Sequence, residues 1–150
     1  MKPDPQRMIE VTAAHLMMRT APALEKGYEQ SSVGLLAVLL LAVREEYDRS
    51  AARRVEENRA LRAIFADGAR VVREGAPELA KRLEAAAHGE DPSLVISELE
   101  RTNAELRGLV IDLHARIEEI DAPEARRIEV AIWAELVAST ERRRLSLGTF

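Results

Sequence analysis

Cysteine is absent from this chain of 150 residues, and aromatic residues make up only 3% of it. Without thiols the chain can form neither disulfides nor thiolate zinc sites. Scarce aromatic residues, with 7 glycines and 6 prolines, disfavour a sheet, whereas the helix formers Ala, Leu, Glu and Arg are abundant. The composition therefore predicts an all-α protein, and its length predicts one domain over residues 1–150.

A positive charge excess and a long apolar run are also missing. The formal net charge is -4, which argues against nucleic acid as a partner, because phosphate binding needs a basic face. The longest apolar run, residues 33–43, is shorter than the roughly 20 residues that span a bilayer, and the N-terminal "MKPDPQRMIE" carries no apolar segment behind a basic start. We expect a cytoplasmic protein without a membrane partner, and the preference for Arg over Lys is typical of a bacterial GC-rich genome.

Acidic residues, prolines and glycines mark the ends of five predicted helices. Asp4 and Asp91 each precede a proline, as helix N-caps often do, and Asp121 with Glu124 forms a capping-box pattern. Glycines suited to end a helix follow at three positions: Gly27, Gly75 and Gly89. The predicted helices cover residues 5–26, 30–73, 77–88, 92–120 and 122–146.

Short connections between these helices favour antiparallel hairpins. We predict hairpins between the last two helices, and between the first helix and the first half of the second. The predicted fold is an antiparallel four-helix bundle with one short additional helix, residues 77–88. The helix over 30–73 would exceed about 60 Å in length, so it either bends near Gly68 or projects from the bundle. Pro22 is a candidate kink in the first helix.

A coiled-coil-like seam runs through the predicted helix over residues 92–120. Its two sets of heptad positions are Ile96, Asn103, Val110 and Ile117, and Leu99, Leu106, Leu113 and Ile120. A single Asn among β-branched residues fixes the register of a helix pair at some cost in stability. The same spacing suits packing within one chain and packing between subunits, so both alternatives stay open.

A second segment is similar to part of this seam. "NRALRAIFAD", residues 58–67, matches "NAELRGLVID", residues 103–112, at four positions that include Asn58 and Asn103. The match is either a coincidence between two Ala- and Leu-rich helices or a trace of duplication. If the two helices run antiparallel, the two amides fall near one polar layer.

The middle of the helix over residues 30–73 is unusually polar. Arg44, Tyr47, Arg54 and Asn58 interrupt an apolar stripe, and burying such groups unpaired is costly. They are therefore either exposed and paired with nearby carboxylates, or they line a pocket in which the arginines bind an anion. The candidate ligand or polar-layer residues are Arg44, Tyr47, Arg54, Asn58 and Asn103. Pairing of Arg44, Arg54 and Asn58 with carboxylates of the chain would count against the pocket.

No pattern in the sequence predicts a catalytic residue, a metal site or a cofactor. His15, His88 and His114 lie on different predicted helices, at spacings that do not suit a shared metal ion. Asp112 and His114 point about 200° apart around their helix, so they cannot hold one ion together. Phosphate-binding loops and nucleophile motifs are not found either.

The first and last predicted helices are apolar on two faces. Each such helix needs a second covering layer, from the same chain or from another subunit. The first hypothesis is a non-enzymatic protein-interaction or scaffold module, a homodimer in which these helices meet; an unidentified protein partner is its variant. The alternative is a bundle that binds an anionic ligand, or is catalytic, through the polar middle of the second helix.

Overall fold

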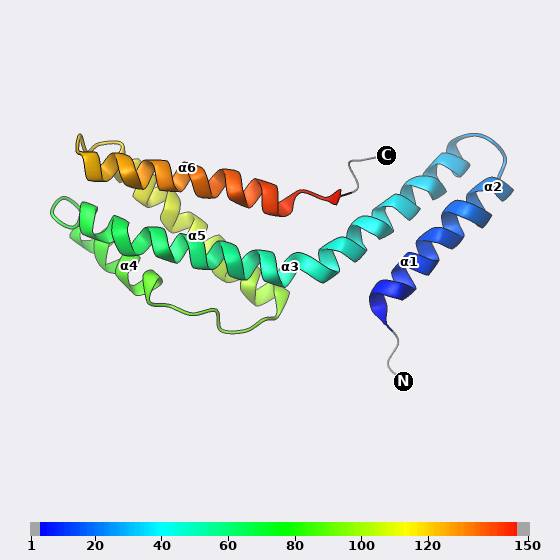
Figure 1. Cartoon of the computed structure of the whole chain (residues 1–150), viewed down its shortest axis with the longest axis horizontal. Coiled ribbons are helices and arrows are strands. Elements are labelled where there is room, and N and C mark those ends of the chain that lie inside the picture. Colours follow the sequence, from blue (N-terminus) through cyan, green and yellow to red (C-terminus); the bar gives the residue numbers. More distant parts are fainter. Residues whose placement is uncertain (1–3, 147–150) are drawn as a thin grey trace. The chain divides into compact units, whose positions relative to one another are not determined.

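The computed structural model describes residues 4–146, and every regular element in that range is helical (Figure 1). Five helical segments occur: α1 (Pro5–His15), continued by the π-helical turn η1 (Leu16–Thr20) and α2 (Ala21–Ala23), then α3 (Tyr28–Val72), α4 (Pro77–Ala87), α5 (Ile96–Ile117) and α6 (Pro123–Arg143). The predicted all-α class is confirmed.

The described residues form two compact units. One comprises residues 4–50 with 145–146, and the other comprises residues 51–144. Helix α3 has residues in both, and Gly68 does not interrupt it. The expectation of one domain stays a prediction. Within residues 4–146, no helix has both the length and the apolar character that a bilayer span requires.

The helix starts agree with the predicted caps at one of three positions. Oδ1 of Asp4 accepts the backbone N–H of Gln6 at 3.1 Å, as an N-cap should. The other two predictions are wrong. Helix α5 begins at Ile96, and Asp91 instead accepts hydrogen bonds from side chains of α3. Asp121 accepts from the guanidinium of Arg126 at 2.6 Å. Asp91 is thus bound by donors from a distant helix, whereas Asp121 is bound by an arginine of the helix that it was expected to cap.

Residues 5–50 form the predicted helical hairpin. Figure 1 shows α1 and α2 beside the first part of α3. The amide of Gln6 donates to Asp48 at 2.6 Å, and that of Gln30 donates to the backbone carbonyl of Ala21 at 3.1 Å, so the two arms run antiparallel. The first arm widens into η1 just before Pro22, because a proline ring clashes with the carbonyl four residues earlier.

In the unit of residues 51–144, α3 and α5 run parallel. Partners on the two helices keep a nearly constant separation in sequence. Arg54 pairs with Glu100, 46 positions later, and Asn58 pairs with Asn103, 45 positions later. The antiparallel arrangement of these two helices considered from the sequence is therefore wrong. Gly68 allows their close approach, since a Cβ there would lie 2.7 Å from Cδ2 of Leu113.

Figure 1 shows that helices α4 and α6 run antiparallel to α5. Arg82 on α4 pairs with Asp112 on α5 at 2.9 Å, and the α6 ring of Trp133 meets the α5 ring of His114. The buried apolar core draws on all four helices: Leu61, Ile64, Phe65, Ala69, Val72, Ala80, Leu83, Leu106, Val110, Leu113, Ile117, Ala125, Ile128 and Ile132. The short helix α4, which we expected to be an addition to the bundle, thus supplies part of this core.

The heptad seam of α5 is buried inside this unit. Leu99 and Leu113 are fully buried, and the remaining seam residues from Asn103 to Ile117 are at most 8% exposed. The first position, Ile96, is exposed. The buried seam residues pack against core residues of the same chain. The structure therefore shows the intrachain alternative for the seam.

Candidate functional site

A chain of hydrogen-bonded polar side chains crosses the core between α3 and α5. Nδ2 of Asn103 donates to Oδ1 of Asn58 at 3.0 Å, and both residues are at most 1% exposed. Nδ2 of Asn58 in turn donates to Oδ1 of Asp91 at 2.9 Å, where Arg62 also donates at 2.8 Å. Because buried amides are costly when unpaired, this layer is stable only with its partners in place.

The carboxylate of Glu57 extends the layer toward α6. It is 2% exposed and accepts from Nη1 of Arg107 at 2.6 Å and from Nη2 of Arg143 at 2.8 Å. Arg143 also reaches Oδ1 of Asn103 at 3.5 Å, which joins this cluster to the amide pair. Burial acts to raise the pKa of Glu57, but the hydrogen bonds from Arg143 and Arg107 outweigh it, so the net pKa is lowered.

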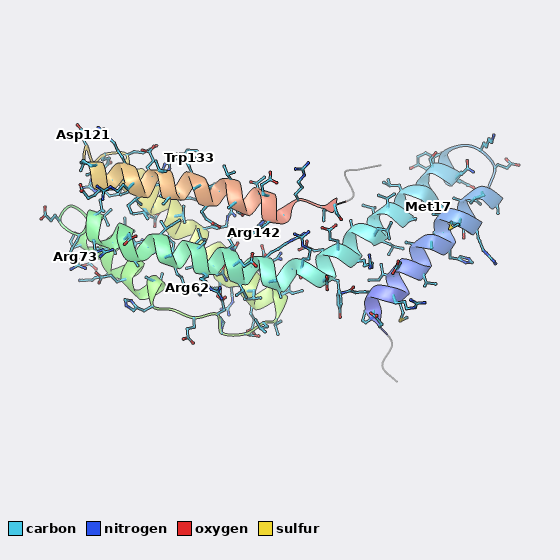
Figure 2. The ribbon with its side chains drawn as sticks, viewed as in Figure 1. Met17, Arg62, Arg73, Asp121, Trp133 and Arg142 are labelled. Carbon is cyan, nitrogen blue, oxygen red and sulfur yellow. The ribbon has the colours of Figure 1, made fainter. Side chains whose placement is uncertain are left out.

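Glu135 on α6 is a second buried carboxylate, with the opposite behaviour. Its side chain pairs with Arg142, whose position on α6 is labelled in Figure 2. Burial raises the pKa of Glu135, and the charge of Arg142 offsets only part of that effect. The two acids of this region therefore differ in their preference for the charged form.

Acid should weaken the contribution of Glu57 to stability. A carboxyl whose pKa is lower in the folded chain than its ordinary value of 4.5 stabilises the fold fully above that pH, and loses this effect as the pH falls through the folded value. We expect Glu57→Gln to lower the free energy of unfolding at pH 7 by about 1–2 kcal/mol. This value is at the low end of the range for hydrogen bonds between charged groups, because Arg107 and Arg143 are both about half exposed and water weakens their attraction to Glu57.

Denaturant unfolding of this variant and the unmodified protein between pH 7 and pH 3 measures the effect. The difference between the two proteins should shrink as the pH falls below 4.5. Glu124→Gln, an exposed carboxyl on α6, is the matched control and should change little at any pH. A difference that stays constant with pH would show that Glu57 acts through its shape and not its charge.

Of the five residues predicted as a site, the structure brings Asn58 and Asn103 into direct contact. Arg54 pairs with Glu100 on α5. Arg44 and Tyr47 belong to the other unit, where the guanidinium of Arg44 lies 3.7 Å from Glu10 and the Tyr47 side chain is exposed. Arg44, Arg54 and Asn58 thus each pair with a carboxylate of the chain, which counts against an anion pocket at these positions.

Sequence reasoning missed five members of the layer: Glu57, Arg62, Asp91, Arg107 and Arg143. Glu57 directly precedes Asn58, and Arg107 lies one turn after Asn103. Their spacing therefore offered a weak signal. Arg143 lies 40 positions from Asn103 and offered none.

A groove of about 290 Å³ opens beside the layer, between α5 and α6. Buried Val110 and Ile132 and the exposed ring of Trp133 line it, and Glu57 and Glu135 lie at its polar end. The rings of Trp133 and His114 meet edge to face, with centroids 5.6 Å apart. Figure 2 labels Trp133 on α6. In residues 4–146, no cluster of three or more His, Asp or Glu side chains is arranged to hold a metal ion.

Comparisons with known proteins assign no family to this chain. No family model, no curated protein and no solved structure matches it. The fold and the polar layer define the class, an all-α helical protein whose packing is consistent with a bundle. Any function must be argued from the geometry of its own residues.

Proposed function

We propose that this protein is a non-enzymatic interaction module that forms a homodimer through the hairpin of residues 5–50. The supporting observation is the uncharged run of residues 33–43, which is apolar on every side of α3. A single second arm, α1 with α2, can cover only one side of that helix. A helix that is apolar all round needs to be enclosed, and the hairpin alone does not enclose it.

The burial pattern of the hairpin supports this proposal. Its buried residues are all small: Ala13, Ala21, Ala37 and Ser50. Ten of its large apolar side chains are exposed instead: Met8, Val11, Met17, Met18, Tyr28, Leu35, Leu36, Leu39, Val43 and Tyr47. Met17 is labelled on this unit in Figure 2. An apolar surface of this extent marks an interaction site in a soluble protein, and methionines suit adaptable packing.

The partner that fits this surface is a second copy of the chain. No charged residue lies within residues 33–43, so this face carries no electrostatic pattern that would select a foreign partner. Two hairpins placed face to face make a four-helix arrangement with an apolar centre. A symmetric dimer of this kind covers the same surface on both chains and then closes. The interface therefore combines α1 with α3, instead of the two outer helices considered from the sequence.

Light scattering across micromolar concentrations tests the dimer. We expect a dimer of the unmodified protein, and a monomer of the variant Leu36→Glu with Leu39→Glu, because two buried carboxylates in each chain would oppose association. Both side chains are about half exposed in the hairpin, so the helices should persist in circular dichroism. Ile111→Glu, at an exposed position in the other unit, is the control and should stay dimeric. A stable monomer of the unmodified protein at these concentrations would refute the proposal.

A further inference from the structure

The groove between α5 and α6 combines apolar walls with a polar end. Val110 and Ile132 form its buried floor, and Ile111 and Ala115 of α5 face it along with Trp133 of α6. Its volume of about 290 Å³ lies just below the usual range for ligand pockets, about 300–1,000 Å³. The apolar part thus suits a small hydrocarbon chain or ring.

The polar end opens toward a second hollow rich in arginine. This hollow, of about 540 Å³, shares Arg107, Leu136 and Ser139 with the groove and is also lined by Arg143 and Arg144. Three arginines and one carboxylate, Glu141, line this hollow. Glu141 lies 3.7 Å from Arg144, and Glu57 bonds to Arg107 and Arg143. Positive charge is therefore in excess where the apolar groove ends.

Two of these arginines retain donors for a ligand. A guanidinium carries five N–H groups, and the bonds to Glu57 and Asn103 engage one nitrogen each, Nη1 of Arg107 and Nη2 of Arg143. Both side chains are nearly half exposed. Since Glu57 accepts a hydrogen bond from each arginine, their remaining N–H groups are available to bind an anion in the hollow.

His114 lines the other end of the groove. Its Nε2 is buried and has no hydrogen-bond partner among the described residues, and the carboxylate of Glu118 is 3.9 Å away. A buried nitrogen without a partner is unfavourable, and a water at this end of the groove would bond to it. Its ring also packs against Trp133, so this wall of the groove is formed by two ordered aromatic groups.

We propose that the unit of residues 51–144 binds a small amphipathic carboxylate. Its apolar part lies between α5 and α6 against Trp133, and its carboxylate pairs with Arg107, Arg143 and Arg144. The charge excess and the apolar walls together favour this ligand over a neutral or a cationic molecule with the same tail. The inference uses residues other than those of the proposed dimer interface, so either can fail without the other.

Trp133 is the only tryptophan of the chain and reports directly on the groove. Octanoate, octanol and octylammonium, three probes with one tail and different head groups, are titrated while its fluorescence is followed. We expect a saturable change with octanoate and an affinity about tenfold or more above that of the other two, as charge-assisted hydrogen bonds provide. Equal or tighter binding of octanol or octylammonium would overturn the proposal.

Matched variants test the two ends of the site separately. Ala115→Leu fills the groove and should abolish the octanoate response, whereas Ala104→Leu, the same change at an exposed position of α5, should leave it unchanged. Arg144→Gln should weaken octanoate but not octanol, and Arg126→Gln near the start of α6 is its control. Circular dichroism verifies that each variant is folded. Full octanoate binding by folded Ala115→Leu would place the ligand elsewhere and refute the site.

Discussion

Replacing Leu106 with alanine is expected to lower the free energy of unfolding by about 2–5 kcal/mol. Leu106 is 5% exposed, occupies the α5 seam and belongs to the core built by four helices. The substitution removes buried methyl and methylene groups and leaves a cavity that rigid neighbouring helices fill only in part. Denaturant unfolding followed by circular dichroism measures this loss.

Ile111→Ala is the matched control for this prediction. Ile111 lies on the same helix, but its side chain is 70% exposed, so its truncation should cost no more than about 0.5 kcal/mol. Equal effects of the two substitutions would mean that the seam is not the buried face of α5. That result would contradict the core described above.

Replacing Asn58 with leucine is expected to cost about 2–3 kcal/mol, although leucine is similar in size and more apolar. The change leaves the buried amide of Asn103 without its acceptor, and it removes one of the two donors to Asp91. An orphaned buried amide costs more than the hydrogen bond itself contributes, because water solvates it in the unfolded chain.

The double variant Asn58→Leu with Asn103→Leu separates pairing from size. Replacing both partners with apolar groups removes the orphaned amide, so we expect part of the lost stability to return. The coupling between the two substitutions, from a double-mutant cycle of unfolding free energies, should be about 1–3 kcal/mol. Simple additivity would show that the two amides act independently and would contradict the shared layer.

Helix existence and class were readable from the sequence because they depend on local chemistry. Proline and glycine act within a few residues, and the five predicted helices agree with those described, apart from shifts of a few residues at their ends. The errors at Asp91 and Asp121 have a different origin. Asp91 bonds to an amide and an arginine that the fold brings near, whereas Asp121 bonds to an arginine only five residues away in place of the backbone of the helix start.

The parallel pairing of α3 with α5 was also present in the sequence, in a signal that we interpreted wrongly. The similar segments at residues 58–67 and 103–112 are offset by 45 positions, the same offset that joins Asn58 to Asn103 in the structure. Two helices with matching heptads and an Asn at the same heptad position favour a parallel, in-register pair. Coincidence and duplication both stay open as the origin of this similarity.

The rest of the site depends on distant parts of the chain and could not be predicted. Arg44 and Tyr47 belonged to the same polar stripe as Asn58 in sequence, yet they lie in a different unit. Glu57 receives Arg143 from 86 positions away, and nothing local to either residue indicates the other. The groove of Trp133 likewise exists only once α5 and α6 are placed side by side.

The polar layer also has a consequence for the order of folding. Its bonds join residues 45, 50 and 86 positions apart, so they close much longer loops than the turns between α4, α5 and α6. Closing a long loop costs more chain entropy, and contacts of this kind tend to form after local ones. We expect the layer to assemble late, after the helices have met. Interactions absent from the folding transition state act mainly on the unfolding rate, so these buried amides and charges would prolong the lifetime of the native state without hastening its formation.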